Sequence, residues 1–187
     1  IVFADVFGEE GFLIASNLDV DGYKIHSEDL LNSYFVAKVA SQKKITIIGV
    51  GGARRIEIYS LLNFLKERDL LNNIILMTGV QTFPTPVDAH SLDEVSDLID
   101  KYGSLGVKVG FSDHVSGDLD EESNIIPLMA LAKGAVAIEK HVTVDRTDKW
   151  EDYESALGKT SFAKFVKHVK NLSPLLGKAG PFSVYED

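Results

Sequence analysis

Short apolar runs rich in β-branched residues alternate with amphipathic stretches of helical period along this chain of 187 residues. An alternating strand and helix pattern predicts an α/β fold whose parallel strands are joined by right-handed crossovers. The predicted strands cover residues 2–6, 22–25, 45–50, 74–78, 108–111 and 135–139. The predicted helices cover about 10–16, 30–41, 54–68, 91–102, 125–133 and 161–172.

Two helix starts are predicted from local chemistry. Asn32-Ser33 supplies N-cap residue types, and Ser91-Leu92-Asp93-Glu94 has the spacing of a capping box. Six βα units suit either an open doubly wound sheet or part of an eight-stranded barrel. No Gly-x-Gly-x-x-Gly turn follows the first strand to favour dinucleotide binding. Composition does not choose between the two architectures.

Histidines follow the last two predicted strands. His114 ends the run Val109-Gly110-Phe111-Ser112-Asp113-His114, and His141 follows Ala137-Ile138-Glu139-Lys140. Roughly 25 residues between them leave room for one loop and one helix, so consecutive barrel strands would place both rings at one rim. Neutral imidazole is a common ligand for divalent transition metals. A shared metal is one reading, and ordinary hydrogen-bonded rim histidines are the other, because two ligands do not complete a site.

Composition excludes several classes of partner. Lys and Arg number 19 against 28 Asp and Glu, and the net charge of −9 argues against nucleic acid or an anionic membrane as the main partner. There is no cysteine, which suits the cytosol, the expected location. No run approaches the roughly 20 apolar residues of a membrane span. The hydrophobic content of 45% is that of a globular domain, and one domain is expected.

Four motifs, taken in order, resemble the sialic acid synthase family, which includes N-acetylneuraminate, pseudaminic, legionaminic and spore-coat sugar synthases. The motifs are Tyr23-Lys24-Ile25-His26-Ser27, Thr82-Phe83-Pro84-Thr85-Pro86, Gly110-Phe111-Ser112-Asp113-His114 and Ile138-Glu139-Lys140-His141-Val142-Thr143-Val144-Asp145-Arg146. The resemblance implies a TIM (β/α)8 barrel, of which residues 1–187 would hold strands three to eight. The first two βα units would then lie upstream of Ile1, and the family's C-terminal antifreeze-like domain is expected to be absent.

The resemblance also implies an activity. Family enzymes condense phosphoenolpyruvate with an N-acylated mannosamine-type sugar, giving a nine-carbon 2-keto acid and phosphate. A divalent cation, usually manganese, would polarise the aldehyde of the sugar. His114 and His141 match the family's metal ligands. The expected partners are these small molecules, with no nucleic acid and no membrane, and the expected assembly is a homodimer.

Five further residues are assigned by the same resemblance. Lys24, Ser27 and Ser112 match positions that hold phosphoenolpyruvate, and Gln81 retains hydrogen-bonding capacity near the substrate. Asp152 roughly matches a carboxylate near the substrate, and it is the expected catalytic residue together with Lys24. Glu151 and Glu154 are the alternatives to Asp152 if the alignment shifts.

Each assignment has a simpler alternative. A lysine at a strand end is more often a solvated rim charge than a ligand, and Ser27 could cap the helix that begins near Asp29. Asp113 would point away from His114 and orient neighbouring backbone. Trp150 and Tyr153 line either a sugar site or only their own loop. The remaining histidines, His26, His90 and His168, are interpreted as structural or exposed.

Three turns depart from the family pattern. Gly49-Val50-Gly51 replaces Ser-Thr-Gly, so two hydroxyl donors are lost, although the backbone N–H groups of Gly49, Gly51 and Gly52 could form an anion nest. Phe83 replaces a tyrosine, and Trp150-Glu151-Asp152-Tyr153 replaces Gly-Pro-Asp-His.

Two functions stay open, a metal-dependent synthase acting on an altered sugar and a non-catalytic sugar-phosphate binding relative. A 3-deoxy-sugar acid synthase that uses phosphoenolpyruvate is less well supported by the Ile138–His141 run.

Overall fold

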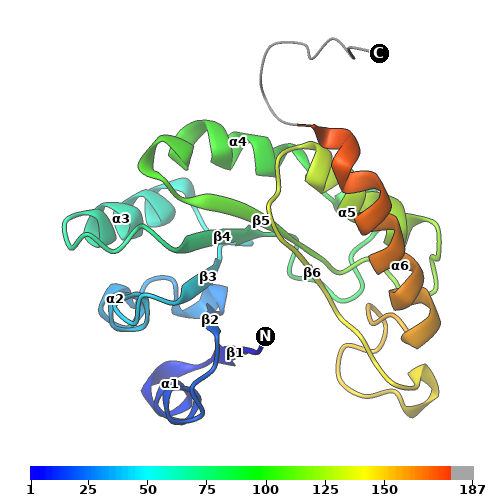
Figure 1. The fold of residues 1–187 in the computed structure, drawn as a ribbon, viewed down its shortest axis with the longest axis horizontal. Coiled ribbons are helices and arrows are strands. Elements are labelled where there is room, and N and C mark those ends of the chain that lie inside the picture. The colour runs from blue at the N-terminus through cyan, green and yellow to red at the C-terminus, as the bar shows by residue number, and fades with distance from the viewer. Residues whose placement is uncertain (178–187) are drawn as a thin grey trace, which may run out of the picture.

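Six parallel strands form a curved sheet in the computed structural model, which describes residues 1–177 (Figure 1). They pair in chain order, so that in this part of the chain β1 and β6 are the two edges. The strands are β1 (Phe3–Val6), β2 (Gly22–Ile25), β3 (Ile45–Gly49), β4 (Ile74–Thr78), β5 (Lys108–Asp113) and β6 (Ile138–Lys140). The absence of any reversal in this order excludes the doubly wound sheet and identifies an arc of a barrel.

Helices cover the outer, convex side of the arc (Figure 1). They are α1 (Gly8–Asn17), α2 (Ser33–Ala40), α3 (Arg55–Lys66), α4 (Asp93–Tyr102), α5 (Glu122–Ala132) and α6 (Lys159–Leu172). Side chains alternate between the two faces of each strand. The convex set, exemplified by Tyr23, Ile25, Ile48 and Leu76, is fully buried and forms the core against the helices.

The concave side is open to solvent in places. Phe3 of β1 and Ile45 of β3 occupy strand positions whose side chains point to the concave side, and both are exposed. A partial barrel has two open strand edges and exposes part of its apolar interior. The concave surface between β1 and β6 is therefore the interior of a half-barrel.

One contact demonstrates the curvature directly. The Lys24 Nζ atom on β2 lies 3.0 Å from Glu139 Oε1 on β6, although three strands separate β2 from β6. Neighbouring strands are about 4.8 Å apart, so side chains on a flat sheet would not span this separation. The sheet must curl until the two side chains meet across its interior.

The boundaries of several elements differ from the prediction. β5 continues two residues further, to Asp113, and β6 begins at Ile138, later than predicted, and ends at Lys140. The helix predicted over 30–41 begins later than expected. A 3-10 turn occupies Ser27–Asp29, and α2 begins only at Ser33, where Asn32 Oδ1 accepts a hydrogen bond from the backbone N–H of Phe35. The cap at Asn32 confirms the prediction there.

The capping box predicted at Ser91 is wrong. The N-cap of α4 is Leu92, and no side chain caps it. Glu94 instead pairs with Arg55 of α3, one of whose guanidinium nitrogens also lies 2.6 Å from Asp97 Oδ2. A bidentate partner in a neighbouring helix competes with a local turn for the same carboxylate, and here it prevails.

The predicted domain extends over residues 1–187, and its last residues, 178–187, lie outside the described part. Among residues 1–177, no helix has the length and apolar character needed to cross a membrane.

Candidate metal and anion site

Alternate residues of two neighbouring strands supply the site. Ser112 and His114 lie two residues apart at the end of β5, and Glu139 and His141 lie two residues apart at the end of β6. Because side chains of a strand alternate with period two, each pair projects to the same face. The parallel register places Ser112 directly opposite Glu139. All four side chains therefore meet on the concave side, at the carboxyl ends of the strands.

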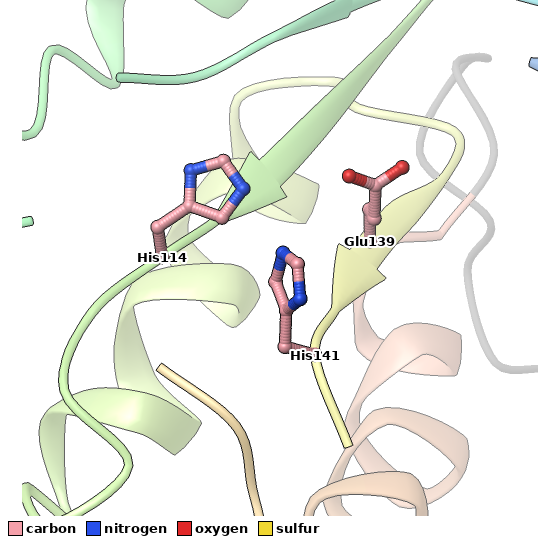
Figure 2. A group of neighbouring side chains, drawn as sticks. All are labelled: His114, Glu139 and His141. Carbon is pink, nitrogen blue, oxygen red and sulfur yellow. The ribbon is translucent and has the colours of Figure 1, made fainter. Parts of the chain in front are cut away.

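His114, Glu139 and His141 form a compact group (Figure 2). The two imidazole centroids are 5.2 Å apart, and one ligand atom from each of the three side chains lies within 4.8 Å of the others. The prediction that both rings project into one space is confirmed. Small side-chain movements would bring these atoms to the roughly 4 Å or less that two metal bonds of about 2.1 Å can span.

Hydrogen bonds fix the orientation and charge of His114. The Nδ1 atom is 2.6 Å from the carbonyl oxygen of Val80, which can only accept, so Nδ1 carries the proton. The Nε2 atom lies 3.0 Å from Ser112 Oγ. Burial, together with the nearby His141 ring, lowers the pKa of His114 and favours the neutral form that binds metals.

Lys24 joins the group from β2. Its ammonium lies 3.2 Å from Asp5 Oδ2 of β1 as well as 3.0 Å from Glu139 Oε1. Burial alone would lower the pKa of Lys24, but the two carboxylates outweigh it and raise that pKa. Burial opposes ionisation of Glu139 as well, yet Lys24 and the Ser112 hydroxyl, which donates at 2.7 Å, lower its pKa. Both groups are charged at neutral pH.

Phe83 covers the imidazoles from the loop after β4. Its ring centroid is 4.3 Å from that of His114 and 5.4 Å from that of His141. The position at which Phe83 stands in place of the expected tyrosine is therefore at the candidate site. This change removes a phenol hydroxyl beside the candidate ligands and leaves an apolar wall.

The three residues His114, Glu139 and His141 fit a divalent transition metal. Two imidazoles and one carboxylate are a donor set that such ions accept while open coordination positions remain. The carboxylate is ionised, His114 is neutral, and the Val80 carbonyl oxygen orients its ring. Outer partners of this kind are typical of metal-binding histidines.

Of the predicted substrate residues, Lys24 and Ser112 join this group, and the structure places the other two nearby at the rim. Ser27 begins the 3-10 turn after β2, and its interpretation as a helix cap is wrong, because His26 occupies the cap position. Gln81 donates to the carbonyl oxygen of Gly79 at 3.3 Å and lines a cavity of about 320 Å³.

Asp152, in the loop between β6 and α6, lies beside the candidate metal site. Its Oδ2 atom is 3.7 Å from His141 Nδ1. Trp150 is 70% exposed, and its indole N–H points to Asp148, 3.3 Å away.

At the carboxyl ends of the strands, glycines stand where two backbone segments approach each other closely. A Cβ atom on Gly49 would lie 2.9 Å from the backbone nitrogen of Ser27, and one on Gly79 would lie 2.2 Å from the carbonyl oxygen of Ser112. Backbone therefore packs against backbone around the rim. A side chain at position 49 would therefore require the turn at Ser27 to move.

Two members of the group were missed by sequence reasoning. Glu139 stood inside a quoted motif without a role, and Asp5 was not considered. The alternation rule would have identified Glu139, since it precedes His141 by two residues on a strand. Asp5 gave no such signal, because its role depends on the parallel register that places it beside Lys24.

The chain matches the model of the NeuB family over residues 1–180. It is 30% identical over 177 residues to pseudaminic acid synthase of Campylobacter jejuni, covering 95% of this chain and 49% of that protein. It is 28% identical to N,N'-diacetyllegionaminic acid synthase of the same species, covering 91% and 49%.

Among solved structures, the N-acetylneuraminic acid synthetase of Leptospira borgpetersenii, in complex with citrate, superposes with a TM-score of 0.85 at 29% identity, covering 98% of this chain and 60% of that one. The chain spans about half the length of the curated relatives it matches. The family match over residues 1–180 and the half-barrel agree, and the chain belongs to the NeuB family.

Proposed function

We propose that the protein containing this chain condenses phosphoenolpyruvate with an N-acylated mannosamine-type sugar to give a nine-carbon 2-keto acid and phosphate. The observation that carries the proposal is the hydrogen-bonded group of Lys24, Ser112 and Glu139 beside the two imidazoles. It combines a cation and a hydroxyl for a phosphorylated acid with donors for a metal. The relatives named synthases for pseudaminic and legionaminic acids support the same reaction class.

The reaction needs an electrophile, a nucleophile and an anion site. C3 of phosphoenolpyruvate forms a bond to the aldehyde carbon of the sugar, water adds at C2, and the C2–O bond to phosphate breaks. A divalent cation, manganese in this proposal, would be held by His114, Glu139 and His141 and would supply Lewis-acid polarisation of the aldehyde oxygen.

In this proposal, residues of the chain bind and orient the two substrates. Lys24 is a compact positive charge that suits a carboxylate or phosphate of phosphoenolpyruvate. Ser112 can donate its hydroxyl to the same substrate once it leaves Glu139. Asp152 is the proposed acid or base for the sugar, because its carboxylate lies 3.7 Å from His141 Nδ1 at the candidate metal site. Ser27 and Gln81 are proposed to contact phosphoenolpyruvate from the rim.

A second candidate is a binding protein without turnover. It is favoured by the rim at Gly49, where the close approach of Ser27 leaves no room for a hydroxyl side chain. In this case phosphoenolpyruvate would bind at Lys24, but phosphate release would lack donors. Restoring Ser at Gly49 is a poor test of this idea, since the new Cβ atom would meet the Ser27 backbone.

The deciding experiment measures phosphate release by the full-length protein. Phosphoenolpyruvate and a panel of N-acyl hexosamines are supplied with Mn²⁺, and then with EDTA. We expect release that requires both substrates and stops with chelator. His141→Ala should abolish it, whereas the matched control His168→Ala, on α6 and remote from the site, should retain it. Binding of phosphoenolpyruvate without release across the whole panel would favour the binding protein.

A further inference from the structure

A buried ion pair lies behind the candidate metal site, on the opposite face of the same two strands. The Lys140 Nζ atom is 2.7 Å from Asp113 Oδ2, and the two side chains are 2% and 0% exposed. They stand directly opposite each other in the parallel register of β5 and β6. The neighbouring pair in that register is Ser112 with Glu139, which faces the site. The same two strands thus carry the site on one face and a buried charge pair on the other.

The pair matters because β6 is short. It has three residues, and within residues 1–177 it pairs with β5 alone. A slip of one residue would turn Glu139 and His141 to the convex face, because side chains alternate. Two hydrogen bonds to β5 precede β6, from the Val136 N–H to Val109 and from the Phe111 N–H to Ala137, so the backbone ladder remains short and the side chains decide much of the register. A slip would also leave the Asp113 carboxylate buried without Lys140, and an unpaired buried charge is strongly unfavourable. The ion pair therefore selects the one register that assembles the site.

Asp113 also contacts the segments on either side. Its Oδ1 atom accepts a hydrogen bond from the backbone N–H of Val115 at 3.0 Å, which fixes the chain just after His114. The same oxygen lies 3.4 Å from Nε2 of His90, whose side chain is almost fully buried. His90 belongs to the connection between β4 and α4, which also supplies Val80 and Phe83. One carboxylate thus touches three of the segments that surround the imidazoles.

We propose that Asp113 and Lys140 are positioning residues that set the register of β6 against β5 and so determine the affinity for the divalent cation. They act through Glu139 and His141 and do not themselves face the concave side. The inference rests on the cation site of the proposed function. Because it concerns binding, it can be tested without turnover.

The test measures Mn²⁺ binding to the full-length protein by the electron paramagnetic resonance signal of free Mn²⁺. The first variant is Asp113→Asn, which keeps the size and the acceptor for Val115 but removes the charge. The second is the double variant Asp113→Leu with Lys140→Met, which removes both charges and so avoids an unpaired buried ion. We expect both to bind Mn²⁺ at least about tenfold more weakly than the wild type, the range seen for outer partners of metal ligands.

Controls separate positioning from general loss of stability. Leu65→Ala removes a fully buried side chain of α3 far from the site, so it should lower the Tm without changing Mn²⁺ affinity. His141→Ala should abolish the binding and so identify the site. If either pair variant remains folded and binds Mn²⁺ like the wild type, the inference is overturned. Wild-type protein that binds Mn²⁺ but releases no phosphate would refute the proposed function and leave this inference intact.

Discussion

The ion pair between Lys24 and Glu139 gives the sharpest quantitative prediction. It joins β2 to β6 across the concave face, and the partners are 115 positions apart in the sequence. We consider Lys24→Met, Glu139→Gln and the double variant, all in the presence of EDTA. The cycle isolates the interaction of the two side chains from the other effects of each substitution.

The magnitude follows from the geometry. At 3.0 Å and an effective dielectric constant of about 20, the Coulomb energy of the pair is roughly 5.5 kcal/mol. Desolvation offsets most of this, since the side chains of Lys24 and Glu139 are only 21% and 24% exposed. Lys24 also keeps Asp5 as a second partner in the Glu139 variant. We therefore expect a coupling free energy of about 1–2 kcal/mol at pH 7.

The assay is urea unfolding of all four proteins at several pH values. The pKa of Glu139 in the folded protein lies below its ordinary value of 4.5, so its stabilisation is present above 4.5 and is lost as pH falls through the folded pKa. The pKa of Lys24 is raised above 10.5, so its contribution is present below 10.5 and is lost as pH rises through the folded value.

The coupling should therefore be largest between these limits and decline on both sides. A coupling below about 0.3 kcal/mol at pH 7, or one that grows on acidification, would refute the reasoning, because either would mean that the two charges do not stabilise each other.

Three further predictions concern single substitutions. His141→Ala should abolish Mn²⁺ binding in an equilibrium titration with little change in Tm, whereas His114→Ala should abolish it and lower the Tm as well, because that side chain is buried. The His114 side chain is 2% exposed. Lys24→Ala should raise the KM for phosphoenolpyruvate much more than it lowers kcat in a phosphate-release assay, and an equal loss in both would point to a role in the chemical step. Gly79→Ala should lower the Tm by several degrees in a thermal melt, because its Cβ would meet the Ser112 carbonyl oxygen; an unchanged Tm would show that the rim can relax.

The architecture could be predicted from the sequence because hydrophobic periodicity reports which face of an element is buried. β4 matches its predicted range of 74–78, and β2 matches 22–25. The regular part of β6 begins at Ile138, although hydrogen bonds to β5 begin at Val136, whose N–H donates to the carbonyl oxygen of Val109. Ala135 was predicted as strand but bonds back to Ala130 of α5, after Gly134 with its positive φ. Local propensity cannot foresee how a helix end delays the next strand.

The site was predicted in part for a similar reason. His114 and His141 stand at strand ends, where position in the sequence translates into position on the rim. Asp113 was expected to orient backbone, and its bond to Val115 confirms this. Its pairing with Lys140 depends on register between strands, which no spacing within one strand contains. Long-range partners of this kind require the folded sheet.

The contact between Lys24 and Glu139 also has a consequence for the order of folding. Partners separated by 115 residues cannot meet until every intervening strand and helix has docked. Contacts of such high sequence separation form late, because the loop-closure entropy must be offset by earlier packing. The ion pair is therefore a product of the final closure of the arc, whereas the three candidate metal ligands come from the neighbouring strands β5 and β6 alone. The strength of the ion pair reports whether the whole sheet has reached its native curvature, while helix content reports only the local steps that precede it.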